Sequence, residues 1–199
     1  KQTSAGVTTR QAPGLRYLDS APPMKISVVI PYHDAERTIV RTLESVNEQT
    51  FPAYEVLLVD DGSSAQSSSF LRDAGLPDSI RVIRTPNRGV AHARNTGAAA
   101  SRGDLLAFLD SDDVWHPEYL RTLSDRFTTD DMGLVFSRLE WIDDNDRSLG
   151  VVNRRIPIPT LARLLTGNFV GSGSNFIVRR DCFEALGGFS EELLAAEDY

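Results

Sequence analysis

The stretch Leu105-Leu106-Ala107-Phe108-Leu109-Asp110-Ser111-Asp112-Asp113 decides the fold of this chain, because an apolar run stops abruptly at three carboxylates. A short, continuous apolar run is typical of a strand that is covered on both faces. Ligands of open α/β sheets sit in the crevice beyond the carboxyl ends of the strands. A hard divalent cation would relieve the repulsion between carboxylates gathered there. A solvated turn that caps a helix, with Asp113 as N-cap, explains the same residues without a ligand.

Strand-like and helix-like segments alternate along the first two thirds of the chain. Apolar runs at residues 26–30, 56–59, 81–83 and 105–109 predict strands, with Pro31 ending the first of them. Helical spacing, or an Ala-rich composition, predicts helices that end near Gln49, Leu71, Ala100 and Phe127, with Asp34 as N-cap of the first. Such alternation predicts βαβ units in a doubly wound, mostly parallel sheet with helices on both faces.

The pattern loosens after Asp131. We expect strands at 134–136 and 175–178, a polar hairpin turn at 143–146, and short helices at 160–165 and 181–186, the last one stopped by Gly187-Gly188. This part reads as an α+β extension of the same sheet. Residues 1–23 are rich in Gln, Thr, Ser, Gly and Pro and lack periodicity, which predicts a flexible tail or linker.

Composition limits the function classes. A chain of 199 residues with 41% hydrophobic content can bury a substantial core as one domain. The net charge of −7 argues against a nucleic-acid partner, which requires a basic stripe. The single Cys182 excludes a disulfide framework and favours a reducing compartment, so we expect a cytoplasmic protein, with the inner face of the membrane compatible. No apolar stretch approaches the roughly 18 residues that span a bilayer.

A second acidic pair, Asp60-Asp61, ends the strand at 56–59. In a parallel sheet it shares an edge with Asp110 and Asp112, and two acidic groups in one crevice favour a functional site. Asn87 and Arg94 lie between them in sequence and could offer an amide and a guanidinium to a phosphate, a ribose or a base. A solvated helix face is the alternative. A nucleoside diphosphate bridged to a divalent cation would suit this mixture.

The chain resembles family 2 inverting glycosyltransferases of the GT-A fold. The resemblance rests on six segments in the family's order and extends over about residues 25–199. It implies a GT-A catalytic domain over residues 24–199, which we expect to be incomplete at its C-terminus because the sequence stops at Tyr199. The segments are Ser27–Tyr32, Ser45–Thr50, Val59–Ser64, Arg88–Gly97, Asp110–Asp113 and Gly187–Glu192.

The resemblance also implies residue roles. Pro31, Tyr32 and Asp34 would line the nucleotide base, and Asp61 would accept a hydrogen bond from uracil. Asn87 and Arg94 would also touch the nucleotide. His33 stands where the family often has Asn, which bears on the base contacts.

Three aspartates carry the chemistry that the resemblance implies. Asp110 would face the ribose or the donor sugar, and Asp112 would bind Mn²⁺ or Mg²⁺, which would neutralise charge on the departing nucleoside diphosphate. Asp198 would be the general base that removes the proton from an acceptor hydroxyl, so that a single displacement inverts the anomeric configuration. Without the resemblance, Asp198 reads as an ordinary helix-start carboxylate.

The expected activity is metal-assisted transfer of a sugar from a nucleotide-sugar, with UDP the expected nucleotide, to a saccharide or other hydroxyl acceptor. A non-catalytic nucleotide-sugar-binding module is the alternative. A nucleotidyltransferase is a third candidate, but it usually carries a Gly-rich, basic loop after its first strand. Residues 31–36 contain no glycine and are acidic, which counts against it.

Overall fold

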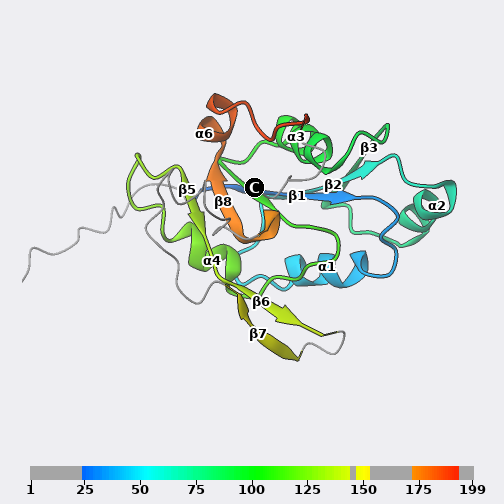
Figure 1. Cartoon of the computed structure of the whole chain (residues 1–199), viewed down its shortest axis with the longest axis horizontal. Coiled ribbons are helices and arrows are strands. Elements are labelled where there is room, and N and C mark those ends of the chain that lie inside the picture. The colour runs from blue at the N-terminus through cyan, green and yellow to red at the C-terminus, as the bar shows by residue number, and fades with distance from the viewer. Residues whose placement is uncertain (1–23, 144–146, 153–171, 193–199) are drawn as a thin grey trace, which may run out of the picture.

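The computed structural model describes residues 24–143, 147–152 and 172–192. Its centre is a six-stranded sheet in the order β3-β2-β1-β4-β8-β5 (Figure 1). The strands β3, β2, β1 and β4 are parallel, and β8 runs antiparallel to both β4 and β5. The predicted doubly wound, mostly parallel sheet is therefore confirmed. The strands of this sheet are β1 (Ile26–Tyr32), β2 (Glu55–Asp61), β3 (Ile80–Thr85), β4 (Leu105–Phe108), β5 (Leu134–Phe136) and β8 (Phe176–Arg179).

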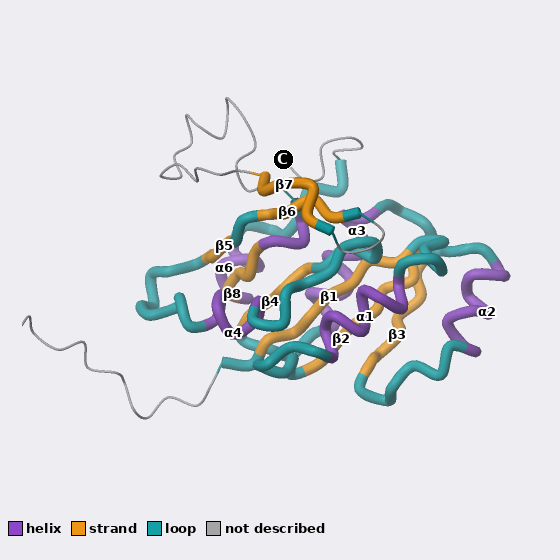
Figure 2. The backbone as a smooth tube through the Cα atoms, turned by 90° about the horizontal axis from the view of Figure 1, so that it is seen from below, coloured by secondary structure: helices purple, strands orange, loops and turns teal. Residues whose placement is uncertain are grey.

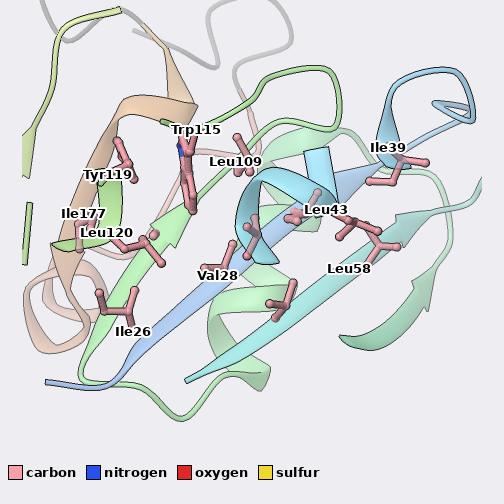
Figure 3. Packing of buried hydrophobic residues seen from close by; sticks show 14 of the residues in the cluster. Ile26, Val28, Ile39, Leu43, Leu58, Leu109, Trp115, Tyr119, Leu120 and Ile177 are labelled. Atoms are coloured by element: carbon pink, nitrogen blue, oxygen red, sulfur yellow. The ribbon is translucent and has the colours of Figure 1, made fainter. Parts of the chain in front are cut away.

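Helices cover both faces of the sheet, as predicted. One apolar cluster joins β1 to α1, α2 and α4, and another packs α3 and the α6 region against β2 and β4. Figure 3 shows part of the first cluster, with Leu43 and Leu120 over the strands and Trp115 beside Tyr119. The helices are α1 (Ile39–Asn47), α2 (Ala65–Asp73), α3 (Val90–Ala100), α4 (Tyr119–Ser124), α6 (Arg180–Ala185) and the 3₁₀ turn η1 (Gly173–Asn175).

A separate antiparallel hairpin, β6 (Leu139–Ile142) with β7 (Ser148–Val152), brackets the predicted turn at 143–146. Figures 1 and 2 show this hairpin at the border of the molecule, away from the central sheet. Its antiparallel pairing agrees with a turn there. The predicted tail at 1–23 and the predicted helix at 160–165 lie outside the described residues. Among the described residues, no helix combines the length and the apolar character needed to cross a bilayer.

Strand β1 continues past the proline that was expected to end it. Pro31 pairs in register with Val59 of β2. The carbonyl of Val29 accepts from Leu109 on the β4 side, and backbone groups two residues apart point to the same side of a strand. The missing N–H of Pro31 therefore faces the side where pairing with β4 has already ended at Phe108, so its absence costs no ladder bond.

Two predicted helix caps are wrong. Helix α1 has Thr38 as its N-cap, and Asp34 lies upstream in a left-handed conformation with φ of 48°. Helix α4 has Glu118 as its N-cap, because Asp113 belongs to a turn closed by its own N–H and the carbonyl of Asp110. In both loops the aspartates serve the edge of the sheet and leave the helix starts to later residues.

Gly97 explains how α3 lies so close to the sheet. A Cβ at this position would lie 2.3 Å from Cγ1 of Val29 and 3.1 Å from Cγ2 of Val59. Both valines are fully buried in neighbouring strands, so neither can move aside. The glycine inside the helix is therefore a packing requirement, which outweighs its cost to helix stability.

We predict that Gly97→Val destabilises the domain, because the added methyl groups would overlap the strand beneath. Overpacking of a tight core costs roughly 1–3 kcal/mol or more, and each kcal/mol lowers the melting temperature of a domain this size by about 2–4 °C. Ala99→Val is the matched control, since Ala99 is exposed on the same helix and receives the same side chain. Equal melting temperatures for the two variants would contradict the packing argument.

Candidate active site at the carboxyl edge of the sheet

The carboxyl ends of β1, β2 and β4 meet at one edge, as the sequence predicted. A cavity of about 200 Å³ opens there between the loops that follow these strands and helix α3. It brings together residues that are far apart in sequence. The lining residues are Pro31, Tyr32, His33, Asp61, Val90, Ala93, Asp110 and Ser111. Another cavity, of about 430 Å³, lies at the amino ends of β2 and β3, away from these groups.

The two aspartates at the end of β2 have separate roles. Asp60 is buried and accepts hydrogen bonds from Nη1 of Arg84 (2.8 Å) and from the N–H of Ser63 (2.9 Å). Only Asp61 lines the cavity. Asp60 therefore stabilises the loop after β2, and the acidic pair read from the sequence contributes one carboxylate to the site.

Asp61 connects β2 to the start of α3. Its carboxylate accepts from the N–H of Gly89 at 2.8 Å and from that of Arg88 at 3.1 Å, and from Oγ1 of Thr85 at 3.2 Å. Free N–H groups at a helix start favour a negative partner. The carboxylate is thus fixed in direction at the cavity wall. Its contact with uracil stays a prediction.

His33 links the loop after β1 to the loop that carries Asn87. Its Nδ1 lies 3.0 Å from the carbonyl oxygen of Asp61, and Nδ2 of Asn87 lies 3.2 Å from its Nε2. A carbonyl only accepts and an amide nitrogen only donates, so these contacts require a neutral imidazole with its proton on Nδ1. The histidine that departs from the family's usual Asn therefore fits a defined place. Asn87 reaches the cavity edge through it.

The remaining two residues predicted to line the base lie on the same loop. Tyr32 is buried, and its hydroxyl is 2.5 Å from Oγ of Ser67, while burial raises its pKa. The carboxylate of Asp34 accepts from the N–H of Ser64 at 2.9 Å, and this hydrogen bond lowers its pKa. These contacts hold the loops after β1 and β2 together beside the cavity.

Arg94 lies beneath the site. Its side chain is 2% exposed, and Nη2 donates to Oδ1 of Asp110 at 2.6 Å. The guanidinium also lies 5.2 Å from the ring centroid of Phe189, and a Cβ at Gly173 would come within 2.5 Å of Nη2. The structure therefore directs Arg94 to Asp110. A contact between Arg94 and a nucleotide stays a prediction.

The turn Asp110–Asp113 is anchored to α1 by buried polar side chains, which the sequence analysis did not single out. Oγ1 of Thr42 lies 3.0 Å from the carbonyl oxygen of Ser111 and 2.9 Å from that of Asp113. Ser45 accepts from the N–H of Trp115, and Gln49 donates to the carbonyl of His116. Polar residues at i, i+3 and i+7 on the buried face of α1 were the signal for this role.

Ser174 of η1 supports the same turn from the other side. Its Oγ accepts from the N–H of Asp110 at 2.9 Å, and its carbonyl oxygen accepts from Nε1 of Trp115 at 2.7 Å. The turn is therefore held by α1 and η1 together. The direction of the carboxylates depends on both.

The donor set fits a divalent cation that is shared with a ligand. Asp110 and Asp112 place two carboxylates on one turn, and the described residues contain no cluster of three or more metal-binding side chains. Mg²⁺ usually binds through one or two carboxylates together with substrate phosphates, so an all-protein cage is unnecessary. Hard oxygen donors also exclude a thiolate-type site.

The segment after α6 is attached to α3, a contact that the sequence analysis missed. Nδ2 of Asn95 donates to the carbonyl of Phe189 (2.9 Å), and Oδ1 of Asn95 accepts its N–H (2.9 Å). Glu191 accepts from Asn95 and lies 3.0 Å from Nη2 of Arg88 and 3.3 Å from Nδ1 of His92. These partners, with Asn95 first, lower the pKa of Glu191. Asp198, the expected base, lies outside the described residues, seven positions further on.

Comparisons with known proteins agree with this fold and site. Residues 27–187 match glycosyl transferase family 2. An uncharacterized glycosyltransferase of Nostoc sp. (strain PCC 7120) is 38% identical over 136 residues, which are 67% of this chain and 42% of that protein. The amylovoran biosynthesis glycosyltransferase AmsB of Erwinia amylovora is 30% identical over 194 residues, covering 88% of this chain and 62% of that protein.

A solved structure extends the likeness to three dimensions. TarS of S. aureus (residues 1–349) aligns with a TM-score of 0.67 and 27% identity, covering 88% of this chain and 53% of that one. A complex of TarS with UDP-GlcNAc aligns with a TM-score of 0.66, 25% identity, and 88% and 51% coverage.

The sheet and its acidic carboxyl edge define a GT-A fold. The chain belongs to glycosyl transferase family 2. It spans 42% and 62% of the lengths of the two relatives named above.

We predict that Thr42→Val destabilises the domain and weakens nucleotide binding, because the carbonyls of Ser111 and Asp113 lose their donor. A buried acceptor left without a partner costs about 1–3 kcal/mol, which corresponds to a melting shift of about 2–4 °C per kcal/mol. Thr38→Val is the control, since Thr38 bonds only locally, to the carbonyl of Ala35. Identical melting curves and nucleotide affinities for both variants would exclude an anchoring role for Thr42.

Proposed function

We propose that this chain is the donor-binding and catalytic part of an inverting, metal-assisted glycosyltransferase that uses a UDP-linked sugar. The observation that carries the proposal is the cavity where Asp61, Asp110 and Ser111 converge at the carboxyl ends of three parallel strands. Nucleotides bind α/β sheets at this edge. The match to family 2 and the likeness to TarS, which has been solved with UDP-GlcNAc, support the same assignment.

Each residue of the site has a proposed task. Pro31, Tyr32 and Asp34 line the base, with Asp61 accepting from uracil and Asn87 contributing through His33. Asp110, held by Arg94, faces the ribose or the donor sugar. Asp112 holds a divalent cation, Mn²⁺ or Mg²⁺, which when bound neutralises the charge that develops on the departing nucleoside diphosphate.

Asp198 is the proposed general base. It accepts the proton of the acceptor hydroxyl while that oxygen attacks the anomeric carbon, and the nucleoside diphosphate leaves from the opposite side. One displacement therefore inverts the configuration. The names of relatives such as AmsB, an amylovoran biosynthesis glycosyltransferase, support a saccharide as the acceptor.

The metal assignment predicts that Asp112→Asn removes the Mn²⁺-dependent part of UDP binding and leaves the fold intact. In the parent, UDP with Mn²⁺ at about 100 times its dissociation constant should add roughly 2.7 kcal/mol of stability. For a domain of this size the melting temperature then rises by roughly 5–10 °C, at about 2–4 °C per kcal/mol. Calorimetry with UDP, with and without Mn²⁺, measures the effect directly.

Asp73→Asn is the control for this experiment, because Asp73 is exposed at the end of α2, far from the site. ADP and GDP serve as comparison ligands for the base. Equal UDP affinity in Asp112→Asn and the parent, both with Mn²⁺, would refute the metal assignment. Equal or larger stabilisation by ADP or GDP would refute the preference for uridine.

The role of Asp198 separates an enzyme from a binding module. A base acts in the transition state and contributes little to holding the donor. In the full-length protein, Asp198→Asn should slow UDP release from UDP-GlcNAc, or from the donor found in the binding screen, by roughly 10²–10⁴-fold. Donor affinity should change by less than about tenfold, or 1.4 kcal/mol.

Glu197→Gln, which alters the neighbouring carboxylate, is the control for Asp198. Turnover that is unchanged in Asp198→Asn would leave the binding module as the better description. Loss of donor binding would show that Asp198 holds the donor and is not the base.

A further inference from the structure

A second cavity lies across the acidic turn from the proposed nucleotide site. It measures about 530 Å³ and is enclosed by the start of α1, helix α4, strand β6 and η1. This volume is within the roughly 300–1,000 Å³ that is typical of small-molecule sites. Asp110 and Ser111 line the nucleotide cavity, whereas Asp112 and Asp113 line this one. A single turn therefore separates two binding spaces.

The charge of the lining limits what this cavity can bind. Two guanidinium groups, of Arg41 and Arg138, face five carboxylates. Even with a divalent cation at Asp112, the lining does not become positive, so it disfavours a phosphate or another anion. Polar groups throughout the lining also disfavour a lipid tail, because burying them without hydrogen bonds is costly. The five carboxylates belong to Asp112, Asp113, Glu118, Glu140 and Asp143.

Trp141 adds an aromatic surface to this polar space. It lines the cavity from β6, yet its residue surface is 68% exposed. Its partner across the hairpin is Gly150, which offers no side chain to cover the ring. An exposed tryptophan presents a large apolar face together with an N–H donor, a combination found where ligands bind. By contrast, Trp115 is buried in the wall, stacked on Tyr119 at 4.4 Å.

We propose that this cavity binds a neutral, hydroxyl-rich saccharide, with one sugar ring stacked on Trp141 and its hydroxyls bonded to the carboxylates and guanidinium groups. A sugar ring offers a C–H face to an aromatic ring and hydroxyls to both kinds of charged group. The saccharide is the acceptor of transfer, a role that rests on the proposed function. Its position beside Asp112 brings the acceptor hydroxyl to the turn that holds the donor.

Ligand-observed NMR titration with methyl glucosides, galactosides and mannosides tests the proposal on the protein without nucleotide. The parent should bind at least one of these glycosides with a dissociation constant on the order of 1–10 mM. Trp141→Ala should weaken that binding by at least about tenfold, and Trp141→Tyr should retain most of it, because it keeps an aromatic face. Leu149→Ala is the matched control: Leu149 is 69% exposed on the paired strand but does not line the cavity.

UDP stabilisation, measured on the same variants, keeps this test separate from the proposed function. Trp141→Ala should respond to UDP and Mn²⁺ as the parent does, which also shows that it is folded. If the parent binds glycosides through Trp141 but ignores UDP, the donor assignment fails and the saccharide site stands. If the parent binds none of the glycosides, or Trp141→Ala binds them as tightly, the saccharide site is overturned.

Discussion

Arg94 buries a guanidinium beneath the carboxyl edge of the sheet, and its ion pair with Asp110 fixes the position of the acidic turn. Removing one partner of such a pair typically costs 3–5 kcal/mol, because the other charge stays buried without compensation. The surrounding residues are chosen to accommodate it. Gly173 leaves space for Nη2, and the ring of Phe189 covers the guanidinium. Helix α3, the strand β4 and the segment after α6 thus meet at a single charge.

The acidic turn is held from both faces of the sheet. On the opposite face from Arg94, the buried polar side chains of α1 bind the backbone of the turn and of the residues that follow it. Backbone carbonyls at the end of a buried strand must find donors, and α1 supplies them where a purely apolar helix could not. The same helix still buries Ile39, Leu43 and Val46 in the core. One helix therefore stabilises the core and positions the carboxylates.

Much of the fold was readable from the sequence because hydrophobic periodicity reports burial directly. The run Leu105–Leu109 is fully buried, and its neighbours form the parallel strands that the alternation predicted. The cap assignments failed at Asp34 and Asp113 because an aspartate before a helix can bond across loops as readily as along the chain. The site was predicted in part: Asp61 and Asp110 line one cavity, whereas Asp60 turns to Arg84.

By itself, the sequence determined the order of strands and helices, the parallel sheet and the edge at which acidic residues gather, because each of these follows from local periodicity and strand polarity. The tertiary structure alone decided which partner each polar group found. It paired Arg94 with Asp110, joined His33 to Asn87, and placed Trp141 on the far side of the acidic turn. Such pairings join residues that are distant along the chain, and no spacing rule records them, since they depend on how loops from separate strands close on one another.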